Sequence, residues 1–272
     1  MENYLCVLGS TSAGNSTVIW NKDEAILVDC GFSVKYFDEN LAKLNIKYGQ
    51  LKGILLTHLH NDHLNLAFLK KMHEFKIPLY VHAKKKKMIE NRKDILRKML
   101  KDNLIKSFEK DEFNVSGFTI SSFEVPHDVP GGCYGYNIYV KNDVSTKKIS
   151  IATDIGYATE TAEESFKNSD LMVIESNHDV VMLENSRRAE WLKERIKNIG
   201  HLSNEQSANF IENVLKKSDT LPKVIMLAHI SQECNTPYLA STTMINKLRY
   251  NNFSEIKVIL TNKSNISEII KI

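Results

Sequence analysis

The densest group of metal-binding side chains is in the segment LLTHLHNDHLN, residues 55–65, which contains His58, His60, Asp62 and His63. Imidazole and carboxylate groups are common protein ligands of Zn²⁺, and a mixed set of them also accepts Mn²⁺. In extended backbone, side chains two positions apart point the same way. His58 and His60 can therefore share one ion while Asp62 and His63 turn towards a second. The spacing predicts a metal site with room for two ions.

Further candidate ligands follow apolar runs elsewhere in the chain. The run GILLTH places the histidine cluster at the end of a strand-type segment. A site for two metals needs more donors than one loop supplies, and His127, Asp154 and His229 each come directly after such a run. Asp29 closes another, AILVDCG, where its carboxylate is suited to orient a ligand imidazole or the adjoining loop. We therefore predict that several strand ends meet around the metals.

The elements that must position these residues alternate along the chain. Strand-type runs such as AILVDC, ISIATD and KVIMLAH are interleaved with helical patterns such as LAFLKKMHEF and NEQSANFIENVLKK. This alternation is typical of an α/β fold. Several runs are apolar on both faces, which predicts sheets buried between layers of other elements. With five scattered prolines and no low-complexity segment, the chain is expected to form one domain over residues 1–272.

The segment 84–110 carries a local excess of positive charge. Between positions 83 and 112, eleven lysines and arginines face six acids, although the net charge of the whole chain is only +3. Apolar pairs at helical spacing, such as Met88 with Ile89 and Met99 with Leu100, predict an amphipathic helical insert. Two interpretations stay open: a docked surface helix with a solvated lysine face, and a surface that binds phosphate groups.

Composition and termini suggest the compartment. The 272 residues are 42% hydrophobic and 25% charged, which is ordinary for a globular protein. The first residues, MENYLCVLGS, have no basic leader, and no run of eighteen apolar residues occurs. The four cysteines have no CxxC spacing, so disulfides are not expected. We expect a cytoplasmic protein that does not contact the membrane.

Taken together in order, the candidate residues resemble the five motifs of the metallo-β-lactamase superfamily. These motifs are Asp29, the 58–63 cluster, His127, Asp154 and His229. The resemblance spans most of the chain. It implies a four-layer αββα sandwich whose two sheets carry the site along one edge, with the basic helical insert added to it.

The resemblance also implies how the ligands divide between two divalent ions, Zn²⁺ or Mn²⁺. One ion would be held by His58, His60 and His127. The other would be held by Asp62, His63 and His229. Asp154 would bridge the two ions.

Shorter motifs are similar to a narrower group. GSTSAGNS, VPHD, ATDIGY, ESNHD, GHLSN and LAHISQECNTP together resemble the bacterial YycJ (WalJ) branch, which is regarded as a group of 5′-to-3′ DNA exonucleases. Similarity to the RNase Z design implies that Glu175 and His201 also lie beside the metals. Nucleases of the RNase J type carry a large extra domain before the last histidine, but only 75 residues separate Asp154 from His229 here. Substrate must then be held by the core edge, by the basic insert or by a second subunit of a homo-oligomer.

The implied chemistry is metal-assisted hydrolysis of phosphodiesters in nucleic acid, with DNA favoured over RNA. Asp62 would bind metal and orient the nucleophile. His201, held by Glu175, would be the general acid that protonates the leaving oxygen. His73 and His82 are expected to be structural histidines, whereas His178 either lines the substrate cleft or forms a turn.

Three alternatives remain at this stage. The same metal cradle suits a hydrolase of a small phosphodiester, a thioester or a lactone, which would not need the basic insert. A redox protein of the flavodiiron type usually has a glutamate where this chain has His60. An inactive nucleic-acid-binding scaffold usually has lost some ligands, whereas every ligand is intact here.

Overall fold

The computed structural model describes residues 2–109, 112–261 and 265–272. Its first sheet has the strand order β14-β1-β2-β3-β4-β5-β6. Neighbouring strands are antiparallel from β14 to β3 and parallel from β3 to β6. The strands are β1 (Tyr4–Thr11), β2 (Gly14–Trp20), β3 (Ala25–Val28), β4 (Leu51–Leu55), β5 (Leu79–His82), β6 (Ile105–Phe108) and β14 (Ile270–Lys271). The parallel half directs the ends of β3 and β4 to the same edge.

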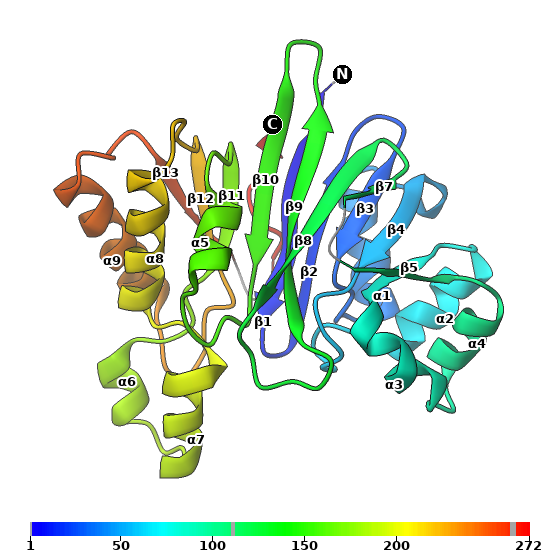
Figure 1. The fold of residues 1–272 in the computed structure, drawn as a ribbon, viewed down its shortest axis with the longest axis horizontal. Helices are drawn as coiled ribbons and strands as arrows, with labels where there is room; N and C mark the ends of the chain where they lie inside the picture. Colours follow the sequence, from blue (N-terminus) through cyan, green and yellow to red (C-terminus); the bar gives the residue numbers. More distant parts are fainter. Residues whose placement is uncertain (1, 110–111, 262–264) are drawn as a thin grey trace.

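The second sheet has the order β13-β12-β11-β10-β9-β8-β7. Strands β10 to β13 are parallel neighbours, and β10, β9, β8 and β7 are antiparallel neighbours. The strands are β7 (Phe113–Val115), β8 (Phe118–Val125), β9 (Cys133–Lys141), β10 (Thr146–Ala152), β11 (Leu171–Glu175), β12 (Val224–Ala228) and β13 (Lys257–Leu260). In Figure 1, β10 points towards the end of the sandwich where α6 (Val180–Glu184) and α7 (Glu190–Arg195) lie.

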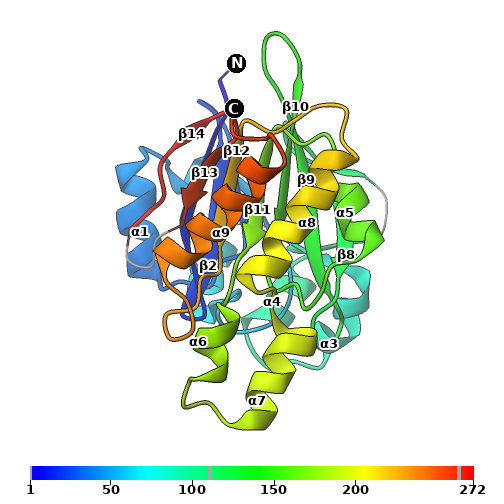
Figure 2. The same ribbon diagram turned by 90° about the vertical axis from the view of Figure 1, so that its left-hand side faces the viewer.

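Helices cover the outer face of each sheet, which gives four layers in the order helix, sheet, sheet, helix (Figures 1 and 2). The helices on the first sheet are α1 (Val34–Lys43), α2 (Leu66–Glu74), α3 (Lys86–Glu90) and α4 (Ile95–Lys101). Those on the second sheet are α5 (Glu160–Phe166), α8 (Asn204–Lys216) and α9 (Pro237–Tyr250). The expected αββα sandwich is confirmed.

Alternation along the strands divides the apolar side chains between separate cores. In β3, Leu27 packs against the helices of the first sheet. Its neighbours Ile26 and Val28 point the other way and join Ile149 and Ile151 of β10 in a core between the two sheets. Because strand neighbours point to opposite faces, a strand that is buried on both sides must be apolar at every position. This explains the continuous apolar runs.

Local sequence determines where the longer helices begin. Each of four residues accepts a hydrogen bond through its side-chain oxygen from the backbone N–H three residues further on: Ser33, Asn65, Ser203 and Thr236. These caps satisfy one of the unpaired donors of the first helical turn. The cap of α8 matters for the site, because it fixes the end of the GHLSN motif.

Residues 84–109 differ from a continuous amphipathic helix. They form the end of the short 3₁₀ helix η2 (Ala83–Lys85), then α3, α4 and the strand β6. Asp94 interrupts the helical path, because its carboxylate accepts a hydrogen bond from Leu96 N and begins α4. The predicted apolar stripe is nevertheless buried, at Ile89, Leu96 and Met99. Lys110, the last residue of the expected insert, lies outside the described residues.

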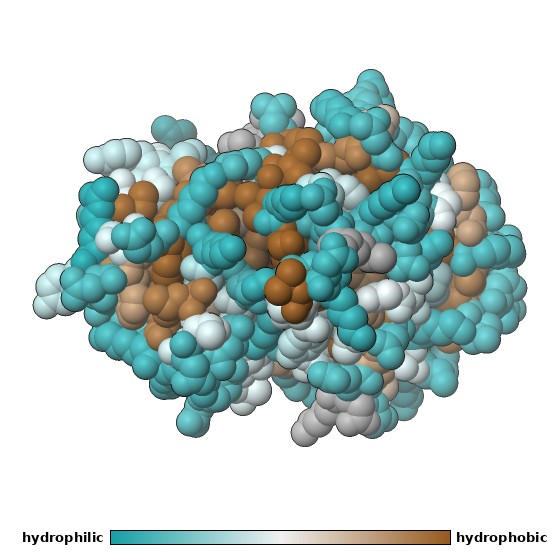
Figure 3. All heavy atoms as spheres, turned by 90° about the horizontal axis from the view of Figure 1, so that it is seen from above, coloured by the Kyte–Doolittle hydropathy of each residue, from teal (hydrophilic) through white to brown (hydrophobic). Residues whose placement is uncertain are grey.

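The end of the sandwich that carries the chain termini has an apolar centre. Figure 3 looks onto this end and shows hydrophobic residues gathered in the middle of the face, with hydrophilic residues around them. Among the helices of the described ranges, none combines the length and the apolar character needed to cross a bilayer.

Lys85 is an exception among the lysines of the basic segment, because its side chain is fully buried. Its Nζ donates a hydrogen bond to Gly131 O (3.3 Å) and lies 4.2 Å from the ring centre of Tyr134. Burial lowers the pKa of this ammonium group to about 8. Lys85 therefore belongs to the core and is not part of the basic surface.

Replacing Lys85 by Met should change how stability depends on pH. Between pH 8 and about 10.5 the unfolded lysine holds its proton while the buried one releases it, so the wild-type free energy of unfolding should rise through this window relative to Lys85→Met. The difference should be on the order of 3 kcal/mol, measured by urea unfolding at several pH values. The exposed Lys86→Met serves as the control. A constant difference between wild type and Lys85→Met would contradict the assignment.

Candidate metal centre

The seven residues expected to bind metal are brought together at one end of the sandwich, where strands end. They come from the loop after β4, from the loops after β8 and β10, and from the end of β12: His58, His60, Asp62, His63, His127, Asp154 and His229. No two loops carrying them are neighbours in the sequence. The fold thus assembles one site from four separate segments, as the positions of the residues after strands predicted.

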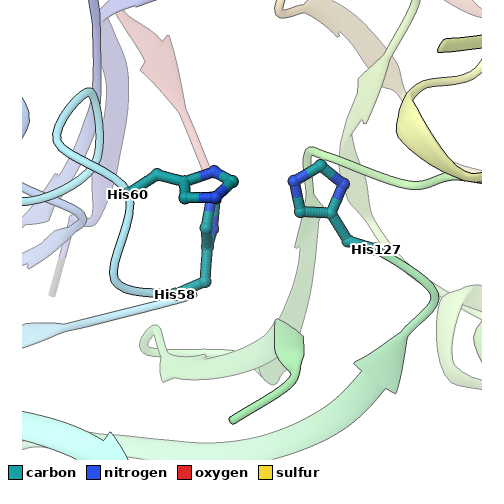
Figure 4. Close-up of side chains that lie close together, drawn as sticks. All are labelled: His58, His60 and His127. Carbon is teal, nitrogen blue, oxygen red and sulfur yellow. The ribbon is translucent and has the colours of Figure 1, made fainter. Parts of the chain in front are cut away.

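One group of ligand atoms consists of three imidazoles. His58, His60 and His127 each offer a ring nitrogen, and these atoms lie within 4.8 Å of one another. Figure 4 shows His58 and His60 on the loop after β4, with His127 facing them from the loop after β8. Three converging imidazoles are a usual ligand set for a divalent transition metal.

The second group is formed by Asp62, His63 and His229, whose ligand atoms also lie within 4.8 Å of one another. Asp154 lies between the two groups. Its Oδ2 is 3.0 Å from His63 Nε2, and its Oδ1 is 4.0 Å from His127 Nε2. Oδ1 is also 3.6 Å from His229 Nδ1. The carboxylate thus lies within about 4 Å of ring nitrogens from both groups, as a ligand shared by the two groups needs.

Several polar atoms at this end are buried and make no hydrogen bond within the described residues. They are His58 Nε2, His127 Nε2, His229 Nε2 and Asp154 Oδ2. A buried polar atom without a hydrogen bond usually costs about 1–3 kcal/mol, so four of them in one place need an explanation. All four belong to the expected ligands, and a bound divalent cation would satisfy them together. The donor set therefore fits a metal centre.

In three of the histidines expected to bind metal, the ring nitrogen Nδ1 is held by an oxygen atom of the protein. His63 Nδ1 is 2.7 Å from Asp29 Oδ2, and His229 Nδ1 is 2.7 Å from Glu175 Oε1. His127 Nδ1 is 3.0 Å from Gly200 O. Partners of this kind fix the tautomer and the orientation of a ligand imidazole. Nε2 of His127 and of His229 has no hydrogen-bond partner among the described residues and is available to a metal, whereas Nε2 of His63 faces Asp154 Oδ2 at 3.0 Å.

Asp29, expected to orient a ligand or a loop, does both. Besides its contact with His63, its Oδ1 accepts hydrogen bonds from Thr57 N (2.8 Å) and from Thr57 Oγ1 (3.1 Å). Thr57 Oγ1 is in turn 3.0 Å from His58 Nδ1. One buried carboxylate thereby connects the positions of two expected ligands.

Three site residues have backbone conformations that non-glycine residues rarely adopt. Asp29, Asp154 and His229 have φ angles of 60°, 57° and 54°, and each follows the end of a strand. The left-handed region is uncommon outside glycine, asparagine and aspartate, and for other residues it typically costs 1–3 kcal/mol. A residue in this conformation ends each strand abruptly and directs its side chain towards the candidate metal centre.

Close backbone packing holds the histidine loop in place. A Cβ atom on Gly31 would lie 1.7 Å from Asp62 O, so only glycine allows the loop to approach the end of β3. Cys30 N donates to His63 O (2.9 Å), and Asn15 N donates to Asp62 O (2.7 Å). The loop is therefore fixed by main-chain contacts as well as by side chains.

The histidines of the two groups differ in their electrostatic environment. Burial lowers the pKa of His58, His60 and His127, which keeps these rings neutral and able to donate lone pairs. At His229 burial also lowers the pKa, but Asp154 and Glu175 together raise it to about 9. In the absence of a cation the second group therefore carries a proton at neutral pH.

Comparison with known proteins identifies the family to which this chain belongs. Residues 24–230 match the model of the beta-lactamase superfamily domain. The chain belongs to this superfamily. Exodeoxyribonuclease WalJ of Streptococcus pneumoniae is 34% identical over 245 residues, which are 89% of this chain and 87% of that protein. Exodeoxyribonuclease YycJ of Bacillus anthracis is 28% identical over 255 residues, which are 93% and 92% of the two chains.

The solved structure of the metallo-beta-lactamase fold protein YhfI from Bacillus subtilis is similar in fold. It has a TM-score of 0.70 and 17% identity, and the match covers 100% of both chains. At this identity the likeness concerns the fold alone. With the family, the relatives and the ligand clusters taken together, this superfamily member is a metal-dependent hydrolase, and its histidine and aspartate clusters suit divalent metal ions.

In this superfamily member Glu175 is fully buried, and both of its oxygens are satisfied. Oε2 accepts hydrogen bonds from Ile155 N (2.8 Å) and Leu202 N (3.1 Å). Oε1 is close to Nδ1 of both His229 (2.7 Å) and His201 (2.9 Å). Burial raises the pKa of this carboxyl, but the two histidines hold it down to about 2. Glu175 is thus placed to position two imidazoles, and it is out of reach of a substrate.

His201 lies beside the centre and is partly exposed, as expected for a residue that meets substrate. Its Nδ1 is bound to Glu175 and is 3.6 Å from Asp154 Oδ1. Its side chain is 21% exposed, whereas that of the neighbouring His229 is 3% exposed. With Nδ1 held by Glu175, Nε2 is the ring nitrogen that remains available.

The remaining histidines lie outside these ligand groups. His73 forms a pair with Asp102 (2.5 Å), and His82 stacks on Tyr134 with ring centres 4.1 Å apart, in agreement with structural roles. His178 is buried, burial lowers its pKa to about 4, and Nδ1 has no partner in the described residues.

Sequence reasoning missed Asn15, a polar neighbour that contacts two of the candidate ligands. Its Nδ2 is 3.0 Å from His63 Nε2 and 3.3 Å from Asp62 Oδ2. Its Oδ1 accepts a hydrogen bond from Ser10 Oγ, which accepts one from His229 N. The motif GSTSAGNS contained this residue, but only the tertiary structure places the turn between β1 and β2 against the histidine loop.

Glu175→Gln should weaken metal binding without unfolding the protein. An amide cannot accept hydrogen bonds at both ends as the carboxylate does, so His229 and His201 would lose their charged partner. We expect metal affinity to fall by about 10–100-fold, the usual effect of removing such a supporting group. Titration against a competing chelator measures it. Glu163→Gln, a buried glutamate that binds Asn213 and Lys217 away from the centre, is the matched control. Equal affinities for wild type and Glu175→Gln would refute the role.

Proposed function

We propose that this hydrolase is a two-metal phosphodiesterase that acts on nucleic acid and removes nucleotides from DNA in the 5′-to-3′ direction. The observation that carries the proposal is the position of Asp154 between two separate groups of ligand atoms. Two relatives that align over most of the chain are named exodeoxyribonucleases, which supports DNA as the substrate. We propose the cytoplasm as the compartment, where DNA is accessible.

The ligand assignment in this proposal follows the two groups. His58, His60 and His127 hold one ion, whereas Asp62, His63 and His229 hold the other. Asp154 serves both. Zn²⁺ and Mn²⁺ both suit this mixture of imidazole and carboxylate. Divalent cations bound here would neutralise charge on the phosphoryl group and make water nucleophilic near neutral pH.

The residues of the chain contribute orientation and a proton. Burial raises the pKa of Asp62, but His63 outweighs burial and lowers it, so this carboxylate is ionised and can orient a water molecule. His201 Nε2 is the candidate proton donor to the leaving oxygen, with Nδ1 bound to Glu175. In the proposal Glu175 is a positioning residue and His201 is the catalytic acid.

Binding of the rest of the substrate is assigned to exposed basic residues of the segment 84–109. The exposed basic residues on and between α3 and α4 are Lys86, Lys87, Lys93, Arg97, Lys98 and Lys101. Lys84 and Lys85 are not counted, because Lys84 pairs with Glu124 (2.8 Å) and Lys85 is buried. Contacts of such residues with phosphates bind DNA without regard to sequence. A second subunit of a homo-oligomer would extend this surface.

We also propose that residues 1–272 form one domain. Both sheets contribute to a common apolar core that contains Leu5 and Ile26 from one sheet and Ile138 and Ile149 from the other. Neither sheet would keep its inner face covered without its partner.

The experiment that tests the function uses end-labelled DNA and RNA, single and double stranded, with Zn²⁺ or Mn²⁺ added to metal-depleted protein. We expect mononucleotides to appear from the 5′ end of DNA and activity to disappear on chelation. Cuts within the strand would show that the protein is an endonuclease and not an exonuclease. Hydrolysis of a thioester, a lactone or a small phosphodiester with no action on DNA or RNA would favour the alternative function.

His201→Ala should slow turnover of DNA by about 10²–10⁴-fold, the usual contribution of a positioned general acid, while metal content stays unchanged. Most of this loss should vanish on a nitrophenyl phosphodiester, whose leaving group departs without a proton. Steady-state rates on both substrates, with metal analysis of each preparation, provide the measurement. His73→Ala, which breaks a histidine–carboxylate pair elsewhere, is the control. Loss of a metal ion, or equal slowing of both substrates, would place His201 among the ligands or the scaffold.

A further inference from the structure

A cleft with a volume of about 1080 Å³ opens beside His127. Its walls come from the end of β5 with η2, from the second half of β8, and from α5 with the loop before it. The volume is slightly above the usual range of about 300–1,000 Å³ for small-molecule sites. Because His127 is both a wall residue and an expected metal ligand, a group bound in the cleft would adjoin the phosphate at the metals.

The cleft exists because β8 is longer than its outer neighbour. β7 pairs only with Phe118–Ile120, whereas β9 pairs with β8 as far as Val125. Residues 121–125 therefore have no strand partner on the β7 side among the described residues. This open edge leads directly to Pro126 and His127.

The lining of the cleft is rich in hydroxyl and aromatic groups and poor in positive charge. Hydroxyl and phenol groups are supplied by Ser122, Thr159, Thr161, Ser165, Tyr134 and Tyr157. The charged lining residues are one lysine and two glutamates, Lys84, Glu109 and Glu124, and Lys84 already pairs with Glu124. Burial lowers the pKa of His82, which keeps it neutral. A continuing chain of phosphates would be repelled here, whereas an uncharged base and sugar would not.

Tyr157 provides an exposed aromatic surface in the lining of the cleft. Its side chain is 48% exposed although its backbone is tightly held. Gly156 N donates a hydrogen bond to Pro126 O (2.6 Å), and a Cβ atom on Gly156 would lie only 2.4 Å from Ile199 O. The backbone next to Tyr157 is thus fixed between the loop that carries His127 and the turn that precedes His201. An exposed ring on a fixed backbone is suited to stack with a planar ligand.

We propose that the cleft binds the 5′-terminal nucleoside of the substrate strand and that Tyr157 stacks on its base. The inference rests on the proposed nuclease function and deepens it, because a cleft that accepts an uncharged end and repels further phosphates favours removal of nucleotides from an end. Stacking does not depend on base identity. The hydroxyl groups of the lining would hydrogen-bond to the sugar and to base edges.

The test compares two 3′-labelled DNA strands that differ only at the 5′-terminal residue, which has a base in one and is abasic in the other. Wild type should have a kcat/KM about 5–150-fold lower on the abasic strand, the usual loss for one stacked base. Tyr157→Ala should show a similar loss on the normal strand and almost no further loss on the abasic one. Tyr157→Phe should behave like wild type. Tyr238→Ala, an exposed tyrosine on α9, is the matched control.

The outcomes separate the inference from the proposed function. Equal rates of wild type on the two strands, or equal slowing of both strands by Tyr157→Ala, would overturn the stacking role while leaving the nuclease assignment intact. If wild type degrades neither strand, the nuclease assignment fails and the inference fails with it. The comparison of strands on wild type needs no variant, so a folding defect in Tyr157→Ala would not obscure the result.

Discussion

The structure is organised around a set of buried polar atoms that have no hydrogen-bond partner among the described residues. His58 Nε2, His127 Nε2, His229 Nε2 and Asp154 Oδ2 meet at one end of the sandwich. Leaving such atoms unpaired would be costly, so their convergence makes sense for a centre that is completed by cations. Three features bring these atoms together and hold them there. They are the left-handed backbone conformations at the strand ends, the close approach of two segments at Gly31, and the supporting carboxylates.

The supporting shell also divides the centre into two halves with different charge. His58, His60 and His127 are kept neutral by burial. The other half contains the carboxylates of Asp154, Asp29 and Glu175, and the pKa of His229 is raised accordingly. Protons on this half take the place that a cation would occupy, and metal binding there must displace them. Glu175 joins this half to His201, because its Oε1 contacts both His229 and His201. In the proposed mechanism, metal binding and proton transfer would therefore depend on the same carboxylate.

Much of the fold, and the convergence of the candidate ligands, could be predicted from the sequence, because apolar runs mark strands and the candidate ligands follow their ends. The resemblance of the ordered motifs to a superfamily supplied the layer order. What could not be predicted depends on contacts between distant segments. Asn15 reaches the centre only because the turn between β1 and β2 packs on the histidine loop. Lys85 looked like part of a basic run, yet its position at the start of α3 buries it under the loop at Gly131.

The most direct test of the account is the number of divalent ions bound per chain. Metal-depleted protein, reconstituted with excess Zn²⁺ or Mn²⁺ and freed of unbound metal, should contain two ions per chain by elemental analysis. Asp154→Asn should lower the occupancy of both positions, because one carboxylate lies between them. A stoichiometry that stays at one ion or below, or an Asp154→Asn variant that still binds two ions as tightly, would contradict the two-metal centre.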